Sequence, residues 1–277
     1  MVVLRDRRLI RLSGNAAIDD VLKLLQGLVT QDCRKIPETG LASAAFLNIK
    51  GKVLADVILW RRPDEMFVDC HSDVCDKLQK LLRRQAFRMP LQIGEANDLA
   101  VHVRRRVCDG FVADPRYAGL GARAILPQSE STVPECFTSD DDYHALRIAC
   151  GVPEGPTDMP PDTQFPLSCN MELTHSVHLQ KGCYIGQENT ARTYFRGVVR
   201  RRFMVASGPV RQGDNVLDEK GSVIGEVTSA SGEVGLCLYR GKADLKKPDD
   251  FAKFDLKGTC NGAEIALRAP PYVHDWA

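Results

Sequence analysis

Lys181-Gly182-Cys183-Tyr184-Ile185-Gly186-Gln187-Glu188 is the most informative stretch of the 277-residue chain. Its two glycines allow a sharp turn or a close backbone approach, and residues 187–195 contain no helix breaker. Cys183 is therefore expected just before a helix N-terminus. There the helix dipole and Lys181 both favour the thiolate, the form of cysteine that reacts or binds soft metals. A free cysteine is more often a small buried hydrophobic residue, and that alternative stays open for Cys183.

Composition restricts the class of protein and its partners. The chain is 44% hydrophobic and 26% charged, with 37 basic and 36 acidic side chains, so its net charge is only +1. This balance gives no general attraction to nucleic acid or to anionic membranes. The run Arg200-Arg201-Arg202 is weak evidence for RNA binding, and no apolar run is long enough to span a bilayer. We therefore expect neither a membrane nor a nucleic acid as partner.

The spacing of the ten cysteines excludes several kinds of site. They are scattered and include no Cys-x-x-Cys pair, unlike a zinc ribbon, a thioredoxin-type site or a conventional ferredoxin. No secretory signal precedes them, so a reducing compartment is expected. We expect the nine cysteines other than Cys183 to be structural, including Cys70 and Cys75, which flank His71.

Hydrophobic periodicity predicts an α+β fold. Residues 44–49 and 53–60 form an expected hairpin, 66–70 a third strand, and Ser72 an N-cap for a helix. Further helices are predicted near 18–28 and 140–150, and further strands near 91, at 99–103 and at 122–126. The hairpins favour antiparallel sheets. From residue 203 short β-patterned runs predict a small all-β unit, so we divide the chain into 1–202, with two subdomains, and 203–277.

The octapeptide, with the Ala191-Arg192 that follows, resembles the YgfZ family of folate-binding, iron–sulfur cluster assembly proteins, relatives of the glycine-cleavage T-protein, an aminomethyltransferase. Residues 27–32 and 51–56 extend the resemblance. Gly151-Val152-Pro153-Glu154-Gly155 is most similar to the eukaryotic mitochondrial branch. The resemblance implies a T-protein-like folate-binding body, a C-terminal β-barrel, and a place in the mitochondrial matrix with a presequence absent or removed.

The resemblance also implies a function. It points to a factor that helps mature mitochondrial four-iron, four-sulfur proteins together with an A-type scaffold protein. A single thiolate cannot hold a cluster that needs four ligands, so Cys183 would share a transient iron–sulfur cluster with that partner. Tetrahydrofolate is the second implied ligand. The residues expected to contact it are Lys181, Tyr184, Gln187, Arg192, Asn170 and Asp56.

These folate contacts have specific chemical reasons. Lys181 and Arg192 suit the carboxylate tail, and arginine gives forked contacts. Glu188 precedes Arg192 by four residues, which favours an ion pair on one helix face. Gln187 and Asn170 suit either a pterin edge or a backbone-fixing network, and for Gln187 we favour the network.

The alternative function is that of a tetrahydrofolate-dependent one-carbon transferase, in which Asp56 would be the catalytic residue. Burying an unpaired carboxylate in the apolar strand at 53–59 costs free energy. An Asp56 that points inward would therefore have a raised pKa and act as a general acid. Strand alternation also permits Asp56 to face solvent. Where aminomethyltransferases carry an acidic residue in Arg-x-Glu-Ala-Gly, this chain has Ala149, which weakens the case for an enzyme. His178, in place of the serine common in relatives, is a candidate neighbour of Cys183.

Overall fold

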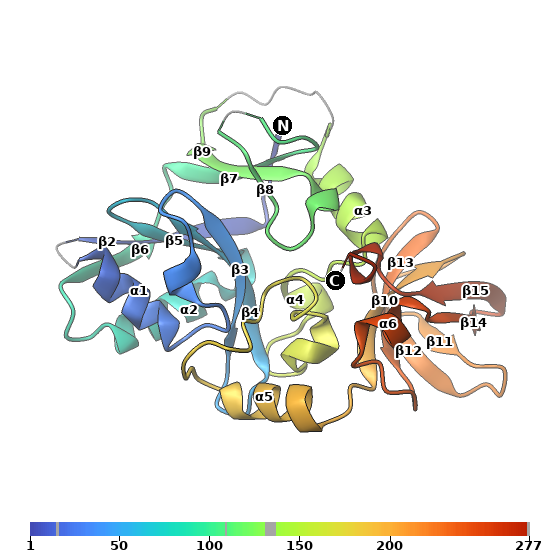
Figure 1. Ribbon diagram of the computed structural model, residues 1–277. Coiled ribbons are helices and arrows are strands. Elements are labelled where there is room, and N and C mark those ends of the chain that lie inside the picture. The colour runs from blue at the N-terminus through green and yellow to red at the C-terminus, as the bar shows by residue number, and fades with distance from the viewer. Residues whose placement is uncertain (15–16, 109, 131–136, 276–277) are drawn as a thin grey trace.

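The computed structural model describes residues 1–14, 17–108, 110–130 and 137–275 (Figure 1). Five antiparallel strands form its first sheet, in the order β3-β4-β5-β2-β6. Their bounds are β2 Arg7–Gly14, β3 Leu41–Leu47, β4 Val53–Arg61, β5 Met66–His71 and β6 Leu91–Glu95. The predicted hairpin and third strand are thus confirmed, and the first sheet starts the body of the protein.

Both faces of the first sheet are covered. Helices α1 (Ile18–Gln26) and α2 (Ser72–Gln85) pack on one face, against alternate strand residues such as Ile10, Phe46 and Val68. His71, rather than the predicted Ser72, caps α2, because its Nδ1 accepts the backbone N–H of Asp73 at 3.2 Å. The other face meets a second sheet, in the order β1-β7-β9-β8. Its strands are β1 Val2–Val3, β7 Leu99–Arg104, β8 Val112–Ala113 and β9 Ala122–Pro127.

A closed six-stranded barrel follows, in the order β10-β13-β12-β11-β14-β15. Its strands are β10 Arg201–Ser207, β11 Asn215–Leu217, β12 Val223–Ser231, β13 Val234–Arg240, β14 Asp255–Cys260 and β15 Ala263–Arg268, with the short helix α6 at Pro248–Ala252. The predicted α+β class with a C-terminal barrel is confirmed. The barrel starts close to the expected boundary at residue 202, and the division into folding units stays a prediction.

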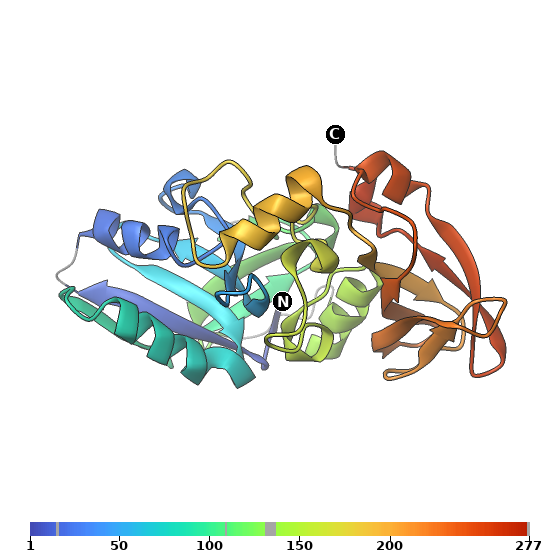
Figure 2. The same cartoon turned by 90° about the horizontal axis from the view of Figure 1, so that it is seen from below.

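Three helices lie between the sheets and the barrel: α3 Asp140–Ala149, α4 Gly155–Asp158 and α5 Gln187–Arg196. Figure 2 shows α5 running from beside the first sheet towards the barrel. Beneath it, Ala45 and Leu47 of β3 share an apolar cluster with Phe203 and Leu238 of the barrel. Body and barrel therefore share a core. Among the described residues, none of the helices combines the length and the apolar character of a membrane span.

Candidate functional site

The loop that contains Cys183 is held against the body by its backbone. Ile185 donates its N–H to the carbonyl of Gly27 at 3.1 Å, just after α1. Gly186 has a φ of +81°, forms the N-cap of α5 and lies against the β3–β4 turn at Gly51. The helix that follows was predicted from the sequence, and its first residue is Gln187. The octapeptide is thus a fixed loop between α1 and α5 rather than a free surface segment.

Lys181 anchors this loop from inside. Its Nζ donates to three backbone carbonyls, those of Gln26 at 2.8 Å, Val29 at 2.7 Å and Gln31 at 2.6 Å. The residue is only 6% exposed, and its ammonium lies 5.0 Å from the centroid of the Tyr184 ring. Burial lowers the pKa of Lys181 to about 8. All three ammonium protons have acceptors, so a folate carboxylate would have to displace a carbonyl to bind here.

Cys183, by contrast, is exposed. It lies at a pocket of about 630 Å³ whose other lining residues include four from α1 and two cations from neighbouring elements. The full lining is Asp19, Leu22, Lys23, Gln26, Gly27, Arg34, Arg61, Gly182 and Cys183. Arg61 donates through Nη1 to the carbonyl of Ile36 at 3.0 Å, and its Nε has no hydrogen-bond partner among the described residues. The thiol therefore opens onto a hollow with cations on its walls.

The other described cysteines differ from Cys183. Seven are buried, and Cys108 is the second exposed one. Cys108 follows β7 and is absent from the lining of the Cys183 pocket. Cys70 and Cys75 both belong to the core beneath α2, which agrees with a structural role. Cys136 lies outside the described residues.

The remaining residues of the octapeptide region are spread around the start of α5. Tyr184 is 8% exposed, and burial raises its pKa to about 12. Gln187 donates through Nε2 to the carbonyl of Gly182 at 3.5 Å and so closes the loop on itself. Arg192 and Glu188 form the expected ion pair at 3.8 Å, on an exposed helix face. His178 contacts Lys35, at 3.0 Å from Nε2 to Nζ, and is not among the residues that line the Cys183 pocket.

Asn170 lies away from this surface. It is fully buried with a φ of +58°, and its Nδ2 donates to the carbonyl of Phe203 at 2.9 Å and to the Tyr272 hydroxyl at 2.8 Å. The amide therefore ties the segment before the octapeptide to the barrel. The structure does not bring Asn170 together with Lys181 or Arg192 in one ligand site.

Asp56 faces the centre of the molecule, on the same face of β4 as Ile58 and Trp60. Its Oδ1 accepts the N–H of Gly155 at 3.0 Å, and its Oδ2 lies 3.5 Å from Nη1 of Arg7. Of the two orientations that alternation allowed, the inward one is present, with the side chain 17% exposed. The carboxylate thus has a cation and a backbone donor as partners.

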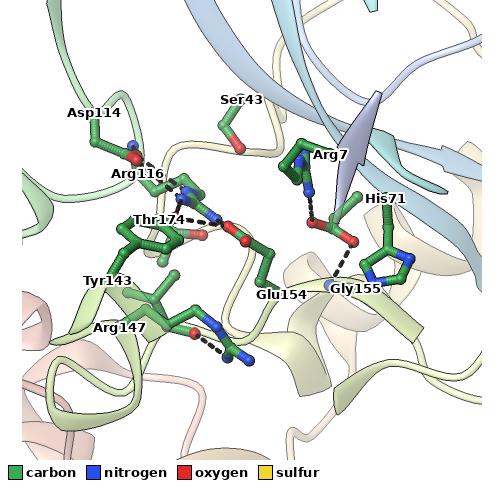
Figure 3. A network of polar contacts seen from close by, with 12 residues as sticks. Arg7, Ser43, His71, Asp114, Arg116, Tyr143, Arg147, Glu154, Gly155 and Thr174 are labelled. Atoms are coloured by element: carbon green, nitrogen blue, oxygen red, sulfur yellow. Dashed lines mark hydrogen bonds and ion pairs between the residues drawn. The ribbon is translucent and has the colours of Figure 1, made fainter. Parts of the chain in front are cut away.

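Arg7 and Asp56 belong to a larger buried ionic network (Figure 3). In it, Arg116 contacts the carboxylates of Asp114 and Glu154 and donates to the Tyr143 hydroxyl. Burial alone would raise the pKa of Asp114, but Arg116 and then Arg123 outweigh it and hold that pKa at about 2. The other members are Asp69 and Arg123, which bridge the two sheets, and the pair Arg147 and Asp158. Ion pairs thus occupy the centre between the sheets and α3.

The sequence interpretation missed most of this network. The available signal was the same as for Asp56, namely a charged residue inside an apolar strand, and it applied equally to Asp69 in β5 and Arg123 in β9. The arginine run at 200–202 was also only partly a surface feature. Arg202 is fully buried, and its Nη1 lies 2.6 Å from Oε1 of Glu172.

Comparisons with known proteins agree with this fold. Residues 196–275 match the family described as the CAF17 C-terminal beta-barrel domain. The crystal structure of glycine cleavage system aminomethyltransferase T from Bartonella henselae gives a TM-score of 0.73 over 98% of this chain and 85% of that chain. At 14% identity this likeness shows the fold alone, and it confirms the T-protein-like architecture expected from the sequence.

Two curated relatives show which family the chain belongs to. The chain is 31% identical to the human protein named "Iron-sulfur cluster assembly factor IBA57, mitochondrial", over 98% of this chain and 83% of that one. It is 32% identical to the mouse protein of the same name, over 86% of this chain and 78% of that one. Their names agree with the mitochondrial location expected from the sequence. The chain therefore belongs to the family of the iron–sulfur cluster assembly factor IBA57.

Proposed function

We propose that this protein is a mitochondrial iron–sulfur cluster assembly factor in which Cys183 supplies one ligand of a transient cluster. The observation that carries the proposal is the exposed thiol of Cys183, presented by a loop that Lys181 and Gly186 hold in place. The names of the human and mouse relatives support the assembly role. The cluster is cargo in this scheme, and it leaves with the client protein.

The arrangement around Cys183 leaves the cluster to be completed by another chain. An iron–sulfur cluster needs four ligands, usually thiolates. Among the described residues the other exposed thiol, that of Cys108, does not line the same pocket. We therefore assign the remaining ligands to a partner, an A-type scaffold protein of the mitochondrial matrix, and the clients to four-iron, four-sulfur proteins. On binding, the Cys183 thiol loses its proton to solvent and its sulfur forms a bond to iron.

The walls of the pocket suit this chemistry. A thiolate-ligated cluster carries negative charge, and cations close to it stabilise that charge. Arg34 and Arg61 both line the pocket of Cys183; Arg34 is paired with Asp32 at 3.0 Å, and Arg61 donates to the Ile36 carbonyl at 3.0 Å. Their guanidinium groups are the cations that an anionic cluster beside Cys183 would meet.

The alternative function is a tetrahydrofolate-dependent one-carbon transferase that uses Asp56. The T-protein-like fold favours it. Against it stands the local chemistry, since Asp56 already has Arg7 and the Gly155 N–H as partners, and Ala149 replaces the acidic residue of aminomethyltransferases. Arg192 is exposed and able to bind the carboxylate tail of a folate. Lys181 could bind that tail only by giving up one of its backbone carbonyl acceptors. Loss of a tetrahydrofolate-dependent turnover in Asp56→Ala would support the transferase, and absence of such turnover in the wild type would remove it.

The direct test of the assembly role uses absorption spectra. The anaerobically purified protein is mixed with an A-type scaffold protein, ferrous iron and sulfide, as wild type, Cys183→Ser and Cys108→Ser. Cys108 is the matched control because it is the other exposed thiol among the described cysteines. We expect a cluster band that requires both chains and is lost only in Cys183→Ser. A band of equal strength in Cys183→Ser, or full rescue by it of cells that lack the endogenous protein, would exclude the proposal.

A further inference from the structure

The barrel carries a second large hollow, which shares no lining residue with the Cys183 pocket. It measures about 900 Å³ and lies where the start of β10, the end of β13, the β11–β12 turn and β14 meet. Its lining combines cations with apolar side chains: Arg200, Arg201, Asp218, Glu219, Lys220, Ser222, Val223, Ile224, Tyr239, Arg240, Gly241, Lys242, Ala243, Leu256 and Lys257. Nothing in the assembly role of Cys183 uses this surface.

Positive charge is concentrated at this hollow. Its lining holds six basic and two acidic residues, while the whole chain has a net charge of only +1. Five of the six basic side chains, namely Arg200, Arg201, Lys220, Arg240 and Lys242, form no ion pair with any described residue, and the sixth, Lys257, pairs with Glu264 at 2.8 Å. The carboxylate of Asp218 is used inside its own turn, where it accepts the N–H groups of Lys220 and Ser222. The cations are therefore available to an external anion.

Two of these cations face each other directly. Arg201 of β10 and Arg240 of β13 are cross-strand partners, and both are exposed. Like charges placed opposite each other on neighbouring strands destabilise a sheet. Since neither arginine forms an ion pair with a carboxylate of the described residues, an anion bound across this pair would remove the repulsion.

The floor of the hollow is apolar. This floor consists of the partly buried Ile224 and Leu256 and of Val223, which is 51% exposed, while the Tyr239 ring belongs to the barrel core. A ligand that fits must therefore combine negative charge with at least one apolar group. Acidic peptide segments with an aliphatic or aromatic anchor have this composition.

A second hollow, beside α5, shares two lining residues with this one. Arg200 and Arg201 also line a smaller hollow of about 370 Å³, together with Asn189, Thr190 and Thr193 of α5. A bound chain could therefore run from the barrel to the helix that begins at the octapeptide.

We propose that the hollow binds an acidic peptide segment of a partner protein, with carboxylates on Arg201, Arg240 and Lys242 and an apolar side chain on the floor. A protein segment fits better than a single-stranded nucleic acid, because the Tyr239 ring is buried and offers no aromatic face for base stacking. The proposal stands on these contacts alone and does not depend on Cys183.

The test measures fluorescence anisotropy of a labelled synthetic peptide of twelve residues in which Glu and Leu alternate. A peptide with Gln in place of Glu and a twelve-nucleotide oligo(dT) serve as the competing probes. The binding variant is Arg201→Gln/Arg240→Gln/Lys242→Gln. The control variant is Arg211→Gln/Lys247→Gln/Lys253→Gln, which removes the same charge from exposed residues of the barrel unit outside the hollow.

We expect saturable binding of the acidic peptide, weakened about tenfold in the binding variant, unchanged in the control variant and reduced by salt. The thermal midpoint of the binding variant should equal or exceed that of the wild type, because the repulsion between Arg201 and Arg240 is gone. Equal weakening in both variants, no preference for Glu over Gln, or tighter binding of oligo(dT) at the same residues would each overturn the proposal.

Discussion

Gly51 and Gly186 lie in direct contact, so that neither position has room for a side chain. A Cβ atom on Gly186 would lie 2.9 Å from Cα of Gly51 and 2.5 Å from the carbonyl oxygen of Asn48. A Cβ atom on Gly51 would lie 2.8 Å from the carbonyl oxygen of Gly186. Both glycines also have positive φ, +79° and +81°. Their contact docks the Cys183 loop on the β3–β4 turn.

Gly186→Ala should therefore destabilise the protein, by about 2 kcal/mol or more, because it adds a steric clash to an unfavourable φ. Gly182→Ala is the matched control, since nothing lies within 4 Å of a Cβ there. Urea unfolding measures both free energies. Equal stability of the two variants would show that the contact with Gly51 does not fix the loop.

Lys181→Met should cost about 3 kcal/mol of folding free energy, because it leaves buried carbonyls of Gln26, Val29 and Gln31 without their donor. Lys23→Met is the control. Lys23 is exposed and only reaches Asp20 at 3.2 Å, so its loss should change the free energy of unfolding by less than about 0.5 kcal/mol. A Lys181→Met protein as stable as Lys23→Met would contradict an anchoring role.

Cysteine modification should follow exposure. In the native protein we expect a maleimide to label Cys183 and Cys108 rapidly and the buried cysteines, such as Cys169 and Cys237, only after unfolding. Burial also raises the pKa of Cys237 to about 12, which keeps its thiol protonated and unreactive. Peptide mapping by mass spectrometry after a short pulse measures the order. Protection of Cys183 in the free protein would place the thiol out of reach of any partner.

Acid should unfold the protein through its central network. The folded pKa of Asp114, about 2, lies below its ordinary value of 3.8, so the stabilisation it provides is complete above pH 4 and is lost as the pH falls towards 2. The shift corresponds to about 2 kcal/mol, and Glu154, whose pKa is also lowered, acts in the same direction.

Free energies of unfolding measured between pH 6 and pH 2.5 test this effect. Asp114→Asn should be less stable at pH 6, because it leaves Arg116 and Arg123 buried without this carboxylate, and should lose less stability on acidification. Glu264→Gln, which removes an exposed carboxylate, is the control and should follow the wild type below pH 4. An identical pH profile for Asp114→Asn would rule out the network as the acid-sensitive element.

Local patterns were sufficient for many elements of the fold. The hairpin at β3 and β4, the strand β5, the helices α3 and α5 and the barrel strands β10, β12 and β13 follow from hydrophobic periodicity and turn residues, which act over a few positions. The barrel strands β11, β14 and β15 were not predicted individually. Periodicity did not identify the α2 cap, because the cap depends on one side-chain nitrogen of His71.

For the candidate site too, some features follow from the local sequence and others only from the tertiary structure. The sequence by itself determined that Cys183 lies in a glycine-flanked loop before a helix and that Glu188 reaches Arg192, since these are contacts within one turn or loop. Only the tertiary structure decided that Lys181 is held by carbonyls about 150 positions earlier in the chain, and that Asp56 meets Arg7. Such contacts join residues whose distance depends on how sheets and helices pack, and no local pattern of residues encodes that distance.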